Sequence, residues 1–269
     1  MPAKIHHSQG RRLFANDVAT YNSARPDYPA VIYQFIVDAT GLKPNTRTLE
    51  VGAGNGLATR KLIELGARPM TLLEPDIRFA GALNSIAEAN PQVTISHETF
   101  ESWQPAAADF DLVTAATSFH WLDPRLRVKK LSQCLHSGGH VALWWNVFRS
   151  IENTYDSFHE ATQSILSGLD KSPSHADKNT DFALDITARK DEFSRTKLFS
   201  ELTCRFVSWE ILLDSAQVRD LYSTFSPISC LAETQRSRVL DQLAEVAEIR
   251  FAGQVSRNMT TILYCAKKI

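Results

Sequence analysis

The sequence has few cysteines, and none of them are paired at the spacing of a zinc site. The four cysteines are scattered along the chain with no CxxC motif, and the eight histidines include no HExxH motif. Isolated cysteines are typical of reduced, buried thiols, and they do not support a disulfide framework. We therefore expect neither a bound metal nor disulfide bonds.

Long hydrophobic runs and an excess of either charge are also absent. No apolar run approaches the roughly 20 residues that a membrane-spanning helix needs, and residues 1–17 lack the hydrophobic core of a signal peptide. The 29 Lys and Arg residues are balanced by 30 Asp and Glu residues, so charge gives no reason to expect a nucleic acid or an anionic membrane as partner. We expect a cytoplasmic protein, a monomer or homodimer, that acts on a small molecule.

What the sequence does contain is a regular alternation of apolar runs and helical patterns from residue 47 to residue 146. This alternation is typical of βαβ units and predicts a mainly parallel sheet, and continuous apolar strands indicate burial on both faces. Two more strand patterns follow near the end of the chain, which brings the sheet to seven strands. The predicted strands are 47–52, 70–74, 92–96, 110–116, 140–145, 202–213 and 259–268.

The length of 269 residues favours one domain with additions to its core. Residues 1–46 form a predicted N-terminal helical lid, with a helix that begins after Pro29 and ends near Gly41. Residues 47–146 form the core, residues 147–198 a helical insertion that could cover a substrate, and residues 199–269 the last part of the sheet.

A glycine-rich turn, "LEVGAGNG", ends the first predicted strand. Gly52, Gly54 and Gly56 permit positive φ and let a ligand approach the backbone, beside the free N–H groups of the next helix. A dinucleotide-binding turn reads GxGxxG, but here the third glycine arrives one residue early. This spacing speaks against a nicotinamide-dependent oxidoreductase.

An acidic residue, Glu74, ends the next predicted strand, 22 residues after Gly52. A carboxylate only accepts hydrogen bonds, so it suits the two vicinal hydroxyls of a ribose. The turn and Glu74 together predict a nucleoside-containing cofactor.

The turn, preceded by Glu50, resembles the first motif of the class I S-adenosylmethionine-dependent methyltransferases. The segments "FESW" and "FDLVTAATSFHWLD", and "VATYNSARPDYP" near the N-terminus, resemble the subgroup of type 11 and trans-aconitate methyltransferases. The resemblance implies a Rossmann-like α/β fold with helices on both faces of a sheet ordered 3-2-1-4-5-7-6, in which only the last strand is antiparallel. It also implies S-adenosylmethionine as cofactor and S-adenosylhomocysteine as product.

The resemblance assigns roles residue by residue. Glu50 is expected either to contact the cofactor or to support the turn, and Glu101 either to border the adenine or to cap a turn. The cofactor-binding residues that the resemblance implies are Tyr21, Arg25, Glu50, Gly52, Ala53, Gly54, Glu74, Pro75, Phe100, Glu101 and Thr117, and the substrate residues are Phe119, His120, Trp121 and Trp145.

The implied reaction is an in-line displacement in which an acceptor atom attacks a methyl group on positively charged sulfur. Alignment supplies much of the rate, so no metal or covalent nucleophile is required. His120 is the candidate catalytic residue, as a base or as a cation that holds a carboxylate, although it could simply line the site. The fork of Arg25 suits a carboxylate, so we expect O-methylation of a carboxylate or a hydroxyl group.

Two other functions remain open in the sequence. One is a catalytically idle protein of the same fold that binds S-adenosylmethionine. The other is nucleic-acid methylation, which the balanced charge disfavours, as does the absence of the Asn-Pro-Pro-Tyr and Pro-Cys signatures common in such enzymes.

Overall fold

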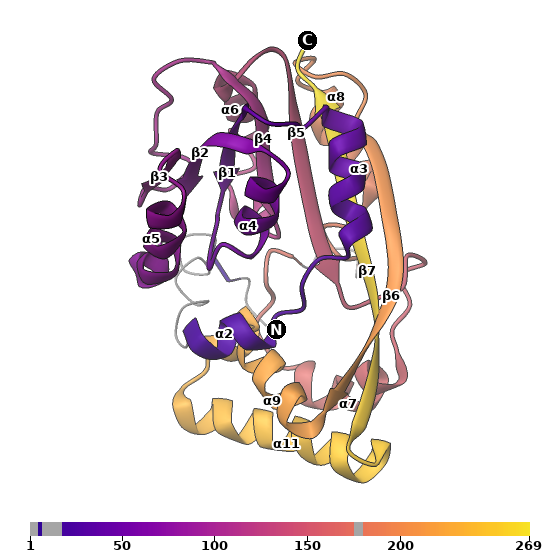
Figure 1. The fold of residues 1–269 in the computed structure, drawn as a ribbon. Helices are drawn as coiled ribbons and strands as arrows, with labels where there is room; N and C mark the ends of the chain where they lie inside the picture. Colours follow the sequence, from indigo (N-terminus) through magenta and orange to yellow (C-terminus); the bar gives the residue numbers. More distant parts are fainter. Residues whose placement is uncertain (1–4, 7–17, 175–179) are drawn as a thin grey trace. The chain divides into compact units, whose positions relative to one another are not determined.

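The computed structural model describes residues 5–6, 18–174 and 180–269 and contains the predicted seven-stranded sheet (Figure 1). The strand order is β3-β2-β1-β4-β5-β7-β6, as predicted. The four pairings of β1 with β2, β1 with β4, β2 with β3 and β4 with β5 are parallel, and β7 is antiparallel. The strands are β1 Thr46–Val51, β2 Ala67–Leu73, β3 Val93–Ser96, β4 Phe110–Ala116, β5 Leu135–Val147, β6 Thr203–Asp214 and β7 Gln254–Lys267.

Strand β5 begins five residues earlier than predicted and includes Gly138 and Gly139. A Cβ atom on Gly139 would lie 2.9 Å from the carbonyl oxygen of Phe110. Glycine here allows β5 to approach β4 closely, so it extends the strand rather than interrupting it.

Helices connect the strands of the sheet. Helix α3 begins after Pro29 and ends at Gly41, whose φ of 71° is left-handed, as its sequence predicts. None of the helices in the described ranges is long and apolar enough to cross a membrane. The helices are α2 Val18–Ala24, α3 Ala30–Thr40, α4 Leu57–Glu64, η1 Ile77–Phe79, α5 Ala80–Ala89, η2 Phe119–Trp121, α6 Arg127–Cys134, α7 Ser157–Leu166, α8 Ile186–Ser194, α9 Ser215–Ser223, α10 Ser226–Ser229 and α11 Glu233–Phe251.

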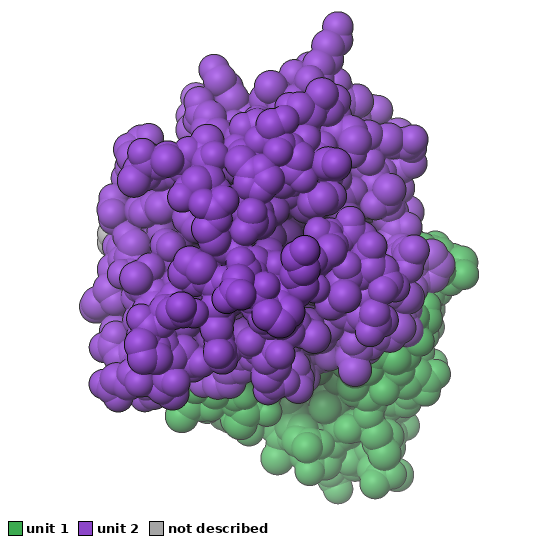
Figure 2. All heavy atoms as spheres, turned by 45° about the horizontal axis from the view of Figure 1, so that its top comes forward, with its two compact units in different colours: residues 1–26, 147–184, 208–260 green, residues 27–146, 185–207, 261–269 purple. Residues whose placement is uncertain are grey.

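The chain divides into two compact units, which Figure 2 colours separately. The first unit comprises residues 1–26, 147–184 and 208–260, and the second comprises residues 27–146, 185–207 and 261–269. The predicted lid and insertion therefore do not coincide with either unit, and their residues 1–4, 7–17 and 175–179 lie outside the described ranges. The prediction of a single domain stays a prediction.

Each unit has its own hydrophobic core. In the second unit, apolar side chains of β2, β4, β5 and β7 are buried with those of α3, α4 and α5, including Ile36, Leu62 and Leu112. In the first unit, α7, α9 and α11 bury residues such as Leu221 and Leu243. These cores account for the continuous apolar runs in the sequence.

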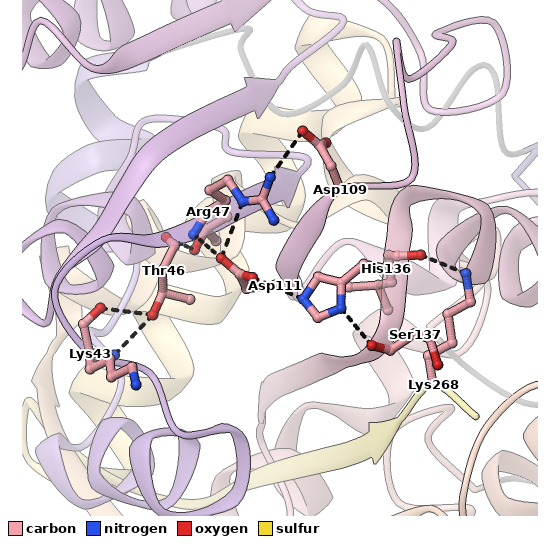
Figure 3. Close-up of polar contacts among 10 residues, drawn as sticks. Lys43, Thr46, Arg47, Asp109, Asp111, His136, Ser137 and Lys268 are labelled. Carbon is pink, nitrogen blue, oxygen red and sulfur yellow. Dashed lines mark hydrogen bonds and ion pairs between the residues drawn. The ribbon is translucent and has the colours of Figure 1, made fainter.

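Hydrogen bonds and an ion pair link the amino-terminal ends of β1, β4 and β5 (Figure 3). The backbone N–H of Arg47 on β1 donates to Asp111 on β4 at 2.7 Å, and His136 Nε2 lies 2.9 Å from the other oxygen of Asp111. Burial alone would raise the pKa of Asp111, but these partners outweigh burial and lower it. The glycine-rich turn, Glu74 and Thr117 lie instead directly after β1, β2 and β4, at the carboxyl ends of parallel strands, where ligands bind in this architecture.

Candidate cofactor and acceptor site

The glycine-rich turn joins β1 to α4 in the second unit. Its three glycines have φ values of 75°, 55° and 78°, a region that favours glycine. The backbone N–H groups of Gly52 and Ala53 both donate to the carbonyl oxygen of Leu73, at 2.8 and 3.1 Å. The turn is therefore attached to the end of β2, next to Glu74.

The three glycines have different surroundings. A Cβ atom on Gly52 would lie 2.6 Å from the Cβ of Ser118, and one on Gly56 would collide with the Cδ1 of Ile86 on α5. A Cβ on Gly54 would meet no atom of the described residues within 4 Å. Gly56 thus packs closely against the Ile86 side chain of α5, whereas no described residue lies beside the backbone of Gly54, which leaves room for a ligand.

Glu74 is fixed by the backbone on both sides. Its Oε2 accepts a hydrogen bond from Gly54 N–H at 2.8 Å, and its Oε1 accepts one from Asp76 N–H at 2.9 Å. Burial raises the pKa of Glu74, and the two N–H groups oppose that rise. Because each carboxylate oxygen has two acceptor positions, one on each oxygen is left for a vicinal diol.

Glu50 is almost completely buried beneath the turn, with 1% of its surface exposed. Its Oε2 accepts a hydrogen bond from the Thr59 hydroxyl at 2.6 Å, and its Oε1 has no hydrogen-bond partner within the described residues. Burial raises the pKa of Glu50 to about 8, against the effect of Thr59, and the charge of Glu74 adds to the rise. A buried acceptor without a partner is costly, so it fits a ligand that brings a donor or a positive charge.

The carboxyl end of β4 carries a strained residue, Thr117, with φ of 53°. Its N–H donates to Trp144 O at 2.7 Å, and its hydroxyl lies 2.8 Å from that of Tyr28. These contacts hold Thr117 in a conformation that few residues other than glycine adopt, and such strain often accompanies a functional site.

The four predicted substrate residues lie close together. Phe119, His120 and Trp121 form η2 and are buried, and Trp145 on β5 donates its indole N–H to His120 Nδ1 at 3.0 Å. The rings of Phe119 and Trp145 meet edge to face, with centroids 6.4 Å apart. The structure thus brings η2 and β5 together in one cluster of aromatic rings and an imidazole.

The two residues predicted near the adenine are engaged in the protein. Glu101 accepts a hydrogen bond from Asp123 N–H at 2.9 Å, the turn contact that the sequence left open. Phe100 is buried, with the ammonium of Lys130 5.5 Å from its ring centre, and Lys130 donates to the carbonyl oxygen of Glu101 at 2.9 Å. Their contact with the adenine stays a prediction.

Tyr21 and Arg25 belong to the first unit. The guanidinium of Arg25 lies 5.3 Å from the Tyr21 ring and 5.0 Å from the Phe225 ring, and it donates to Thr224 O at 2.9 Å. These contacts describe packing within that unit, so their role beside the cofactor stays a prediction. Pro75, in the second unit, lies half-buried between Glu74 and Asp76.

Two further candidate site residues were not predicted from the sequence. Tyr28, which contacts Thr117, is 89 positions away from it in the sequence. Ile77 follows the Glu74 turn and is 62% exposed, so an apolar ring could cover it. Its position three residues after Glu74 was the available signal, but single exposed apolar residues are common.

Comparison with known proteins agrees with this geometry. A family model for ribosomal RNA adenine dimethylases matches residues 29–131, which is less than half of the chain and includes the glycine turn and Glu74. An uncharacterised methyltransferase of Schizosaccharomyces pombe is 23% identical over 262 residues, covering 96% of this chain and 98% of that protein.

Solved structures show the same architecture. A protein described as a type II methyltransferase, from Anaeromyxobacter dehalogenans, superposes with a TM-score of 0.62 at 16% identity, covering 91% of this chain and 97% of that one. The chain has the class I S-adenosylmethionine-dependent methyltransferase fold. Phosphoethanolamine N-methyltransferase 2 of Haemonchus contortus, in a complex that contains S-adenosylhomocysteine, gives a TM-score of 0.60 at 10% identity, covering 98% of this chain and 60% of that one.

The fold and the relatives support one class of enzyme. The full-length relative and the fold identify the chain as a methyltransferase with the class I S-adenosylmethionine-dependent fold. The residues present fit S-adenosylmethionine, because Gly54 leaves room beside the backbone, Glu74 can accept from a diol, and Glu50 has a buried acceptor without a partner within the described residues.

Proposed function

We propose that this methyltransferase acts on a small molecule and methylates an oxygen atom, on a carboxylate or a hydroxyl group. The observation that carries the cofactor side is Glu74, whose two oxygens are oriented by the N–H groups of Gly54 and Asp76. The acceptor side rests on the buried cluster around His120. Membership of the type 11 and trans-aconitate subgroup is part of this proposal.

The second unit supplies the proposed cofactor contacts. Glu74 would accept hydrogen bonds from the ribose hydroxyls, and Glu50 would receive the donor or positive charge that its Oε1 lacks. Gly54 would allow close approach to the backbone. Ile77, exposed beside the Glu74 turn, would lie against the adenine, a role that adds to those proposed for Phe100 and Glu101.

When bound, S-adenosylmethionine supplies a methyl group on a positively charged sulfur, and the chain's own residues align the acceptor with it. The rings of Phe119, Trp121 and Trp145 exclude water, which strengthens the electrostatic interactions of the site. Alignment of two reactants contributes on the order of 7 to 11 kcal/mol to lowering a barrier. Such a site requires no covalent intermediate.

Calorimetric titration followed by methyl transfer tests this proposal. The protein is first titrated with S-adenosylmethionine, and then incubated with it and the small-molecule fraction of a cell extract. Mass spectrometry should find compounds heavier by about 14 Da, the mass of one added CH₂. Binding without any methylated product would favour the catalytically idle alternative.

An RNA acceptor is the second candidate, because of the match to ribosomal RNA adenine dimethylases. That match covers the cofactor-binding part of the chain and leaves out residues 132–269. The charge of the whole chain is balanced, whereas RNA binding commonly uses a basic surface. Transfer of labelled methyl groups to total cellular RNA, in the same assay, would replace the small-molecule proposal.

A further inference from the structure

The hydrogen bond between Trp145 and His120 determines where the imidazole carries its proton. The indole Nε1–H of Trp145 lies 3.0 Å from His120 Nδ1, and an indole nitrogen can only donate. Nδ1 must therefore keep its lone pair. The imidazole is then neutral, with its proton on Nε2.

Packing holds the indole in place for this contact. Trp145 is 2% exposed and His120 is 4% exposed, and the Trp145 ring meets those of Phe119 and Tyr264 edge to face, at 6.4 and 6.1 Å between centroids. Trp145 also occupies a buried position in the middle of the sheet, on β5. A side chain so surrounded loses little further entropy when it orients a neighbour.

The adjacent Trp144 provides an internal comparison. It is also fully buried on β5, but successive side chains of a strand point to opposite faces. Its indole nitrogen has no hydrogen-bond partner within the described part of the chain. The two neighbouring tryptophans therefore differ in the one property that matters here, a hydrogen bond to an imidazole.

We propose that Trp145 is a positioning residue that holds His120 neutral, with the proton on Nε2, so that His120 serves methyl transfer as a hydrogen-bond donor rather than as a base. The catalytic part of this inference rests on the proposed function. The tautomer itself is a property of the protein alone.

This role selects among acceptors. A base must offer a lone pair, but Nδ1 of His120 is engaged by Trp145 and Nε2 already carries a hydrogen. A hydroxyl acceptor would need to lose a proton to such a base. A carboxylate is already ionised near neutral pH, so its oxygen attacks the methyl carbon directly. The new C–O bond forms, the C–S bond breaks with its electron pair left on sulfur, and no proton is transferred.

The tautomer is measured on the whole protein labelled with ¹⁵N-histidine, by long-range ¹H–¹⁵N correlation spectra. In the unsubstituted protein the His120 proton should reside on Nε2 at neutral pH. Trp145→Phe should reduce the ratio of the Nε2–H to the Nδ1–H form about fivefold, the equivalent of one hydrogen bond of about 1 kcal/mol. Trp144→Phe should leave that ratio unchanged. A proton on Nδ1, or a cationic His120, in the unsubstituted protein would overturn the proposal.

The catalytic part is tested with two substitutions of His120. Gln places an amide N–H near the position of Nε2 but cannot act as a base, whereas Phe removes the donor. A donor role predicts that His120→Gln keeps at least tenfold more kcat than His120→Phe, with similar affinity for S-adenosylmethionine. Equal loss in both variants, with circular dichroism spectra that match that of the unsubstituted protein, would contradict a donor role.

The acceptor is tested with methyl-labelled S-adenosylmethionine and the small-molecule fraction of a cell extract. A methyl ester releases its label as methanol in mild base, whereas a methyl ether or methylamine does not. Base-labile label is expected, and base-stable label would overturn the carboxylate assignment. If no label is transferred at all, the proposed function fails, while the histidine spectra still decide the role of Trp145.

Discussion

Glu50→Gln removes the ionisation of a buried carboxyl group while keeping its shape. Burial holds the pKa of Glu50 at about 8 in the folded protein, against an ordinary value of 4.5. The difference of about 3.5, at about 1.36 kcal/mol for each pKa unit, corresponds to about 5 kcal/mol. This is the free energy by which an ionised Glu50 would destabilise the folded chain relative to a neutral one.

The sign follows from proton binding. Between the two pKa values the unfolded chain has released the proton of Glu50 while the folded chain retains it, so the stability of the unsubstituted protein falls as pH rises. Above about pH 8 both states are ionised and the fall stops. Glu50→Gln has no such proton, so its stability should rise relative to that of the unsubstituted protein by about 2 to 3 kcal/mol between about pH 5.5 and 7.5.

Urea denaturation without cofactor, at several pH values, measures this difference. Glu88→Gln is the matched control, because it makes the same change at an exposed position on α5. A free-energy difference for Glu50→Gln that stays flat from about pH 5.5 to 7.5 would refute the reasoning about burial.

Three further substitutions separate packing from cofactor binding and test the hydrogen bonds of Asp111 at the amino-terminal ends of the strands. Gly54→Ala should cost about 1 to 2 kcal/mol of stability for its positive φ. It should weaken S-adenosylmethionine binding at least tenfold, because its Cβ enters space that no described residue occupies; unchanged affinity by calorimetry would exclude close approach at this position. Gly56→Ala should cost about 3 kcal/mol or more in urea denaturation, because strain adds to a collision with Ile86; a loss no greater than that of Gly54→Ala would contradict this account. Asp111→Asn should be less stable than the unsubstituted protein above about pH 4, and the two stabilities should converge at lower pH. The reason is that a carboxyl group with a lowered pKa in the folded state stabilises the protein only above its pKa in the unfolded chain; a stability difference independent of pH would contradict this expectation.

Much of the sheet could be predicted because each strand is indicated by the apolar pattern of its own residues. The apolar runs around residues 47–52 and 110–116 and the helix end at Gly41 depend on neighbouring residues alone. The strand order came from resemblance to a family rather than from periodicity. The start of β5 was missed because the need for Gly139 depends on the carbonyl of Phe110, on another strand.

The site was less predictable, because its contacts join residues far apart in the sequence. Glu74 could be recognised from spacing, but not that its oxygens would accept from Gly54 and Asp76. The spacing of Gly56 identified the motif, yet its packing requirement comes from Ile86. The hydrogen bond from Trp145, 25 positions after His120, redirects the proposed role of the histidine from base to donor.

The central claim is that S-adenosylmethionine binds at the turn formed by Gly54 and Glu74. Calorimetric titration of the unsubstituted protein and Glu74→Ala with S-adenosylmethionine tests it most directly. We predict a single site in the unsubstituted protein, weakened by about 1.5 to 3 kcal/mol in the variant, which is roughly 10- to 150-fold in Kd. Equal affinity in the two proteins, or no binding to the unsubstituted one, would contradict the account.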